Sequence, residues 1–144
     1  MGQLTSRLTL TGSSADYGAA VALSTTKLLS VQKPFIGLSK EVVTTTGANH
    51  IILPNLDARR FVYVKHTGLD STGAATIADL HVETYTSNAG ADQAIMILKT
   101  GEFAFFPFDN GLADPANGDD DNKLQLQATS GTIVAEYSYY TVAS

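Results

Sequence analysis

The sequence predicts an all-β fold, a single β-sandwich or jelly-roll-like barrel of about eight to ten short antiparallel strands. Apolar and polar residues alternate along most of the chain, which is the period of a strand with one buried face. Turn-forming residues interrupt this alternation at near-regular spacing, and no stretch has an amphipathic helical period. The whole chain, 1–144, fits one domain, and the sequence leaves open an extended N-terminal arm.

The individual strands follow from the alternation and from the residues that end it. Pro34 separates two of them, because proline cannot donate to a strand ladder. Residues 17–23 are Ala-rich and leave open a short helical turn. The expected strands are 3–10, 25–33, 35–46, 50–53, 60–66, 76–86, 94–98, 103–108, 123–128 and 132–142.

Two of these strands carry a more detailed prediction. Strand 60–66 places Val62, Val64 and His66 on one face, and its other face, with Phe61 and Tyr63, is also partly apolar. A strand with two partly apolar faces is expected in the middle of a sheet. The run 94–98 is continuously apolar, which predicts a buried strand.

Charge and composition limit the classes of partner. Charged residues make up 16% of the chain, against about 25% in an average soluble domain. Neutral polar side chains lose less free energy than charged ones when water is removed, so this surface suits contact with another protein. A plain Thr-rich β-protein is the simpler interpretation. The net charge of −5 disfavours binding to nucleic acid and to anionic membranes.

Other sequence signals are weak. The chain has no Cys, so a disulfide or a thiolate metal site is excluded. No apolar run reaches the ~20 residues that a membrane span needs, and we expect no signal peptide. The first residues match the Met-Gly-x-x-x-Ser pattern for lipidation at Gly2, but Leu4 and Leu8 continue as an alternating strand, which is the preferred interpretation.

The sequence predicts no catalytic site, cofactor or metal. His50, His66 and His81 lack the spacing of metal or hydrolase motifs, and we expect ordinary surface or interface histidines. The loop 109–122 has four aspartates between Asp114 and Asp121, yet it fails the calcium-loop pattern and is expected to be solvated. Whether its segment Asp114–Asn122 binds a cation stays open.

Isolated carboxylates add no chemistry. Glu83, Glu102 and Glu136 each stand alone among their strand neighbours, so paired acid chemistry is not indicated. Glu102 lies in a turn, where solvent or a backbone N–H is its expected partner.

Aromatic residues form the candidate contact surface. The run 103–108 and the last strand are richer in aromatic residues than one buried strand face requires, and such residues are enriched at the centres of interfaces. Burial on both sides of a sandwich is the alternative interpretation. The candidate contact residues are Phe103, Phe105, Phe106, Phe108, Tyr137, Tyr139 and Tyr140.

Three segments together resemble small virion structural proteins of tailed bacteriophages, especially those of marine and cyanobacterial hosts. They are Leu4–Leu10 (LTSRLTL), Phe61–Gly68 (FVYVKHTG), and Gly101–Pro107 (GEFAFFP) with Val134–Tyr137 (VAEY). These motifs are short strand patterns and carry no chemical signature. The loop 109–122 departs from the resemblance as an apparent insertion.

The resemblance implies a structural virion protein without enzymatic activity, most specifically a capsid decoration (cement) protein. Its implied partners are copies of itself, as a homo-oligomer such as a trimer, and other virion proteins such as the major capsid protein. Its implied location is the virion, assembled in the host cytoplasm. A tail, neck or baseplate component is the alternative. A carbohydrate- or receptor-binding module is the alternative from another class, with Tyr63, Tyr85 and the tyrosines near the C-terminus as residues that could stack on sugars.

Overall fold

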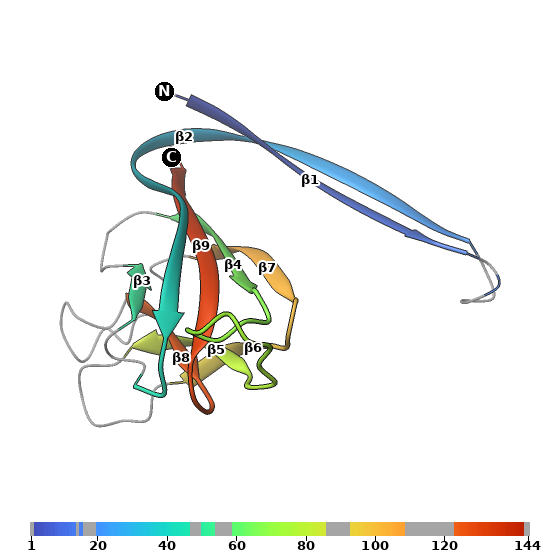
Figure 1. Cartoon of the computed structure of the whole chain (residues 1–144). Helices are drawn as coiled ribbons and strands as arrows, with labels where there is room; N and C mark the ends of the chain where they lie inside the picture. Colours follow the sequence, from blue (N-terminus) through green and yellow to red (C-terminus); the bar gives the residue numbers. More distant parts are fainter. Residues whose placement is uncertain are drawn as a thin grey trace.

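Figure 1 shows the computed structural model, a two-sheet β-domain from which a long β-hairpin projects. It describes residues 2–13, 15, 20–46, 50–53, 59–85, 93–108 and 123–142. Nine strands lie within these ranges. They are β1 (Gly2–Gly12), β2 (Val21–Val43), β3 (Ile51–Leu53), β4 (Arg60–His66), β5 (Leu80–Tyr85), β6 (Gln93–Leu98), β7 (Phe103–Phe108), β8 (Lys123–Ala128) and β9 (Ile133–Val142).

The strands form two antiparallel sheets, which confirms the all-β prediction. Sheet A has the order β1-β2-β9-β4-β7, and sheet B has the order β3-β8-β5-β6. Over the described residues the two sheets stay open and do not close into a barrel. Strand β4 lies between β9 and β7, as its two partly apolar faces predicted.

The core lies between the inner faces of the two sheets. Sheet A contributes alternate residues of β4 and β9, such as Val62, Val64 and Ile133, and sheet B contributes residues such as Leu80 and Leu126. Each of these side chains is at most 1% exposed. In β4 and β9 the alternation seen in the sequence therefore has the predicted result: one face of the strand packs in the core and the other face lies outside.

Strand β2 corrects the prediction of two strands separated by Pro34. One strand runs from Val21 to Val43, and its pairing with β9 shifts register between Gln32 and Phe35. Pro34 falls within this shift. Because an irregular position needs no ladder hydrogen bond from the residue there, the missing N–H of proline is tolerated. A short helical turn over 17–23 is also excluded for its described end, since Val21–Leu23 belong to β2.

The two halves of β2 have different neighbours. Residues Val21–Val31 pair with the whole of β1, and Val31–Val43 pair with β9. The first half and β1 therefore form a two-stranded ribbon, here called the arm, which projects from the body (Figure 1). The sequence left open an extended N-terminal arm but did not predict a hairpin.

Strand β6 corrects a second prediction. The apolar run 94–98 does not lie in a fully buried strand, because β6 is the edge strand of sheet B, next to β5 alone. Ile95 and Ile97 are 41% and 49% exposed. A register shift between Val82 and Glu83 disturbs the pairing of β5 with β6. Bulges at sheet edges are a common protection against unwanted strand pairing, and Pro107 on edge strand β7 serves the same end.

His66 and His50 correct the expectation of surface histidines, since both side chains are buried. His66 accepts the backbone N–H of Gly68 at Nδ1 (2.9 Å), so its ring proton lies on Nε2, which donates to the carbonyl of Ala78 (2.8 Å). The buried His66 imidazole thereby joins the two ends of the long connection between β4 and β5, at Gly68 and Ala78.

A tight contact in this connection gives a first prediction. Gly68 has φ +83° and a Cβ there would lie 2.9 Å from the Thr100 methyl carbon, whereas Gly73 has φ +84° with open space around it. Gly73→Ala is expected to cost about 1–2 kcal/mol in free energy of unfolding, from the backbone alone. Gly68→Ala is expected to cost more, because of the added contact. Urea denaturation measures both losses.

Thr100→Ser supplies the control. Serine keeps the hydroxyl that donates to the carbonyl of Thr76 (2.9 Å) but lacks the methyl group. In this background the loss from Gly68→Ala should fall to that from Gly73→Ala. An unchanged loss would show that the Thr100 methyl is not the cause.

The turn after β4 gives a pH prediction. One carboxylate oxygen of Asp70 accepts hydrogen bonds from the Thr72 hydroxyl (2.7 Å) and from the backbone N–H groups of Thr72 (2.8 Å) and Ala74 (3.0 Å). These bonds favour the charged form, with the Thr72 hydroxyl as the largest cause, and lower the pKa of Asp70 below its usual value. The stabilisation is present above the ordinary aspartate pKa and is lost as pH falls through the lowered one.

Carboxyl NMR titration measures this pKa. Thr72→Val should raise the Asp70 midpoint toward the ordinary aspartate value, because it removes the hydroxyl donor. Thr72→Ser keeps that donor and should leave the midpoint low. Equal midpoints in the two variants would refute the assigned cause.

Candidate interaction surface

The outer side of sheet A carries a cluster of aromatic side chains, here called the aromatic face. Tyr63 and Phe105 are cross-strand partners of β4 and β7, and Phe61 pairs with Tyr140 of β9. The Phe61 and Phe105 rings stack with centroids 5.4 Å apart, and the Tyr63 and Phe103 rings lie 6.3 Å apart. Phe103 is 62% exposed. We define the aromatic face as Phe61, Tyr63, Phe103, Phe105 and Tyr140.

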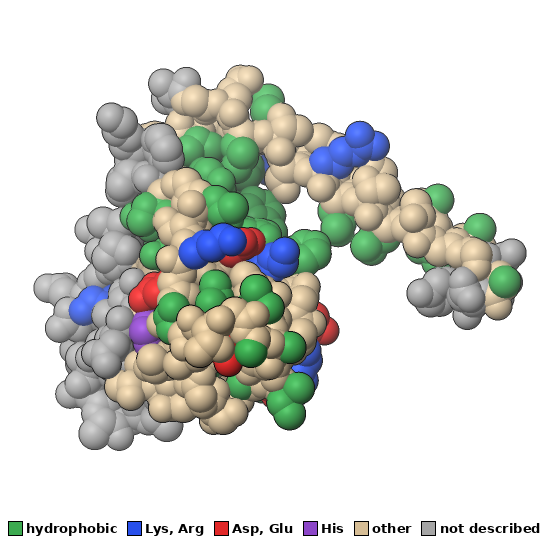
Figure 2. Space-filling view, viewed as in Figure 1, with side chains coloured by type: hydrophobic (Ala, Val, Ile, Leu, Met, Phe, Trp, Pro, Cys, Tyr) green, Lys and Arg blue, Asp and Glu red, His purple; other side chains and the backbone are tan. Residues whose placement is uncertain are grey.

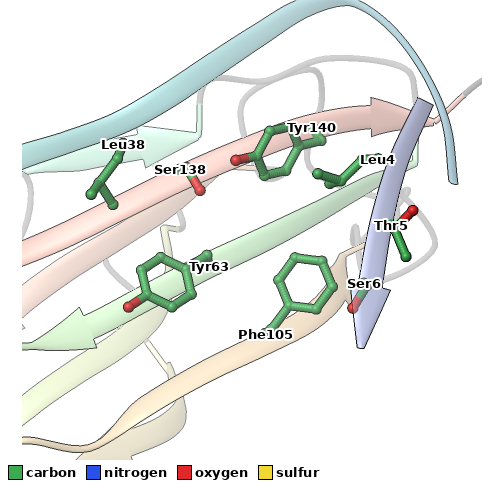
Figure 3. A pocket seen from close by; sticks show the side chains of 8 residues that line it. All are labelled: Leu4, Thr5, Ser6, Leu38, Tyr63, Phe105, Ser138 and Tyr140. Carbon is green, nitrogen blue, oxygen red and sulfur yellow. The ribbon is translucent and has the colours of Figure 1, made fainter. Parts of the chain in front are cut away.

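The base of the arm crosses this face and leaves a cavity of about 330 Å³. Figure 3 shows Leu4, Thr5 and Ser6 of β1 on one side of it and Tyr63, Phe105 and Tyr140 on the other, with Leu38 and Ser138 completing the lining. Partial burial, and secondarily the charge of Glu136, raise the pKa of Tyr63. Like any tyrosine phenol at neutral pH, that of Tyr63 is protonated and can donate a hydrogen bond.

The arm is amphipathic. Residues directly opposite each other in an antiparallel pair share one face. One face of the arm therefore carries the pairs Leu4 with Leu29 and Leu10 with Leu23. The other carries mainly threonine and serine with Arg7, and Leu28 is its exposed exception.

The apolar face of the arm is covered only near its base. Leu29 and Val31 are buried, but toward the tip Leu8, Leu10, Val21 and Leu23 are all more than 40% exposed. We call these four residues the arm stripe. Figure 2 shows hydrophobic side chains along the underside of the projecting arm, over open space beside the body.

The structure divides the sequence-predicted contact residues between two environments. Phe103, Phe105 and Tyr140 belong to the aromatic face. Phe106 and Tyr137 pack against the core, and Phe108 and Tyr139 are part of it. The division follows from strand alternation, with the inner four residues at positions that pair with the inward-facing Arg60, Val62 and Val64.

The residues of the arm stripe, and Leu38, were not among the candidate contact residues identified from the sequence. A usable signal was present, because Leu8 and Leu10 precede the turn-rich segment 12–18 and Val21 and Leu23 follow it with the same period of two. Such a pattern is typical of a hairpin with one apolar face. The Ala-rich composition of 17–23 hid the second half of it.

Glu41, His50 and Thr44 are arranged in space like the carboxylate, histidine and hydroxyl of a hydrolase triad. His50 Nδ1 lies 2.8 Å from Glu41 Oε1, and its Nε2 lies 3.0 Å from the Thr44 hydroxyl. However, the backbone N–H of Thr44 also donates to Nε2 (3.0 Å). The single lone pair of Nε2 is thus already used, and it is poorly placed to take a proton from the hydroxyl. We interpret the group as a structural closure of the 44–50 connection.

The isolated acidic residues have local partners. Glu102 accepts the backbone N–H of Lys99 (2.8 Å), which confirms the partner expected for it. Glu136 pairs with Lys40 (3.0 Å), and buried Glu83 accepts from the Gln125 amide (3.0 Å). No three His, Asp or Glu side chains of the described ranges gather to hold a metal ion. The acidic loop 109–122 lies outside the described residues.

Comparisons with known proteins give no relative. No protein-family model, curated protein or solved structure matches this chain. Within the described ranges, no helix has the length and apolarity to cross a membrane.

Proposed function

We propose that this chain is a structural protein of a tailed-phage virion, most specifically a capsid decoration protein. The observation that carries the proposal is the arm stripe: a projecting ribbon with four exposed Leu and Val side chains on one face. A two-stranded hairpin is at best marginally stable in water, so such a face is expected to be covered in the working protein.

Two further features support a role in assembly. The aromatic face is partly exposed next to the arm, most of all at Phe103, and large aromatic side chains dominate the energetics of protein interfaces. The chain is also poor in charged residues, which lowers the cost of removing water from its surface. The choice of a phage particle rests on the resemblance of the strand motifs, and a tail, neck or baseplate position has the same physical support.

The copy number of this chain in purified virions tests the proposal. Hundreds of copies per particle are expected for capsid decoration, whereas a few to a dozen would indicate the tail, neck or baseplate. Absence from the purified particle would reject both positions.

The cavity at the base of the arm favours a second candidate, binding of a carbohydrate. Its lining combines the rings of Tyr63, Phe105 and Tyr140 with the hydroxyls of Ser6 and Ser138. Aromatic faces beside hydroxyl groups suit stacking on a sugar ring. A glycan array should then give hits that Tyr63→Ala abolishes, and an array without hits would reject this candidate.

A further inference from the structure

We propose that the arm of one copy of this chain docks, through its apolar stripe, on the aromatic face of a second copy. The inference rests on the proposed assembly role and names the partner of the arm. Its starting point is that one chain carries two apolar surfaces open to solvent: the arm stripe, and the part of the aromatic face where Phe103 is 62% and Phe105 36% exposed.

The base of the arm shows how such a contact would be made. There Leu4 lies over the aromatic face beside Tyr140, with Leu29 opposite it on β2 (Figure 3). The arm stripe continues the same face of the ribbon toward the tip, with Leu8 and Leu10 in line with Leu4. The ribbon therefore presents the same kind of surface to a second copy as it presents to its own body.

Charge disfavours contact between two arms. The arm, 2–12 and 21–31, carries Arg7 and Lys27 and no acidic residue. Two arms face to face would therefore bring like charges together. Lys27 lies on the apolar face of the arm, opposite Ser6.

Two variants test each side of the contact. Leu10→Asp places a charge in the arm stripe, and Phe103→Asp places one on the aromatic face at a residue that does not line the cavity. We expect analytical ultracentrifugation to show association of the unmodified chain and the mass of a single chain for each variant. Thr11→Asp, on the polar face of the arm, and Ile97→Asp, on sheet B, are the matched controls and should associate normally.

Mixing the two variants sharpens the test. The Phe103→Asp chain keeps an intact arm, and the Leu10→Asp chain keeps an intact aromatic face, so the mixture should form a species of two chains that neither variant forms alone. Because the chain has no Cys, Leu10→Cys and Phe103→Cys can be introduced singly. A mixed disulfide between the two chains under mild oxidation is expected, with Thr11→Cys giving much less.

Three results would overturn the inference: an unmodified chain that stays single at high concentration, equal loss of association in Thr11→Asp, or disulfides mainly between two Leu10→Cys arms. Circular dichroism of each variant excludes unfolding as the cause, and the cysteine pair does not depend on a disruptive charge. The copy number in purified virions tests the proposed function independently of this association. A chain absent from virions that still associates arm to face refutes only the proposed function, and a virion chain that stays single in solution refutes only this inference.

Discussion

Replacing His66 by phenylalanine is expected to lower the free energy of unfolding by about 2–6 kcal/mol. The substitution removes both hydrogen bonds of a fully buried imidazole, to the N–H of Gly68 and the carbonyl of Ala78. Each buried group left without a partner costs about 1–3 kcal/mol. Urea denaturation followed by tyrosine fluorescence measures the loss.

His81→Phe is the control for this prediction. The side chain of His81 is partly exposed and makes one long contact (3.3 Å) with buried Glu83, whose other carboxylate oxygen keeps the Gln125 amide (3.0 Å). Its replacement should therefore cost less than that of His66, about 1 kcal/mol. Similar losses in the two variants would mean that the His66 hydrogen bonds do not hold the β4–β5 connection.

Leu80→Ala is expected to lower the free energy of unfolding by about 2–5 kcal/mol, because it opens a cavity at a fully buried position between the sheets. Ile97→Ala, on the adjoining edge strand β6, removes a similar side chain that is half exposed and should cost well under half as much. Thermal and urea unfolding of both variants give the comparison. A small loss for Leu80→Ala would place the core elsewhere than between sheets A and B.

Strand alternation predicted much of the fold, because burial of one face determines which residues repeat with a period of two. It gave the bounds of β4 and β7 and the inward face of β9, with Ile133, Ala135, Tyr137 and Tyr139 together. It failed where one strand changes partners. Pro34 predicted the end of a strand, because the sequence alone cannot show the register shift at which no N–H is needed for the ladder.

The candidate surface was only half predictable for a related reason. Alternation shows that Phe105 and Phe106 point to opposite sides, but not which side meets the other sheet. That choice depends on strand order, which places β7 next to β4 and leaves Phe105 outside. The prediction of surface histidines was wrong for a different reason. The buried His66 has polar partners, Gly68 and Ala78, that only the folded connection brings close to it.

The continuity of β2 has a mechanical consequence. A pull on the tip of the arm enters the body along the strand that pairs with β9 over Val31–Val43. The hydrogen bonds of an antiparallel pair are perpendicular to the strands, so a load along β2 shears many of them at once instead of opening them one by one. The arm is thus anchored as a tether whose tension is shared across sheet A, and the body should resist extraction from an assembly held by that arm.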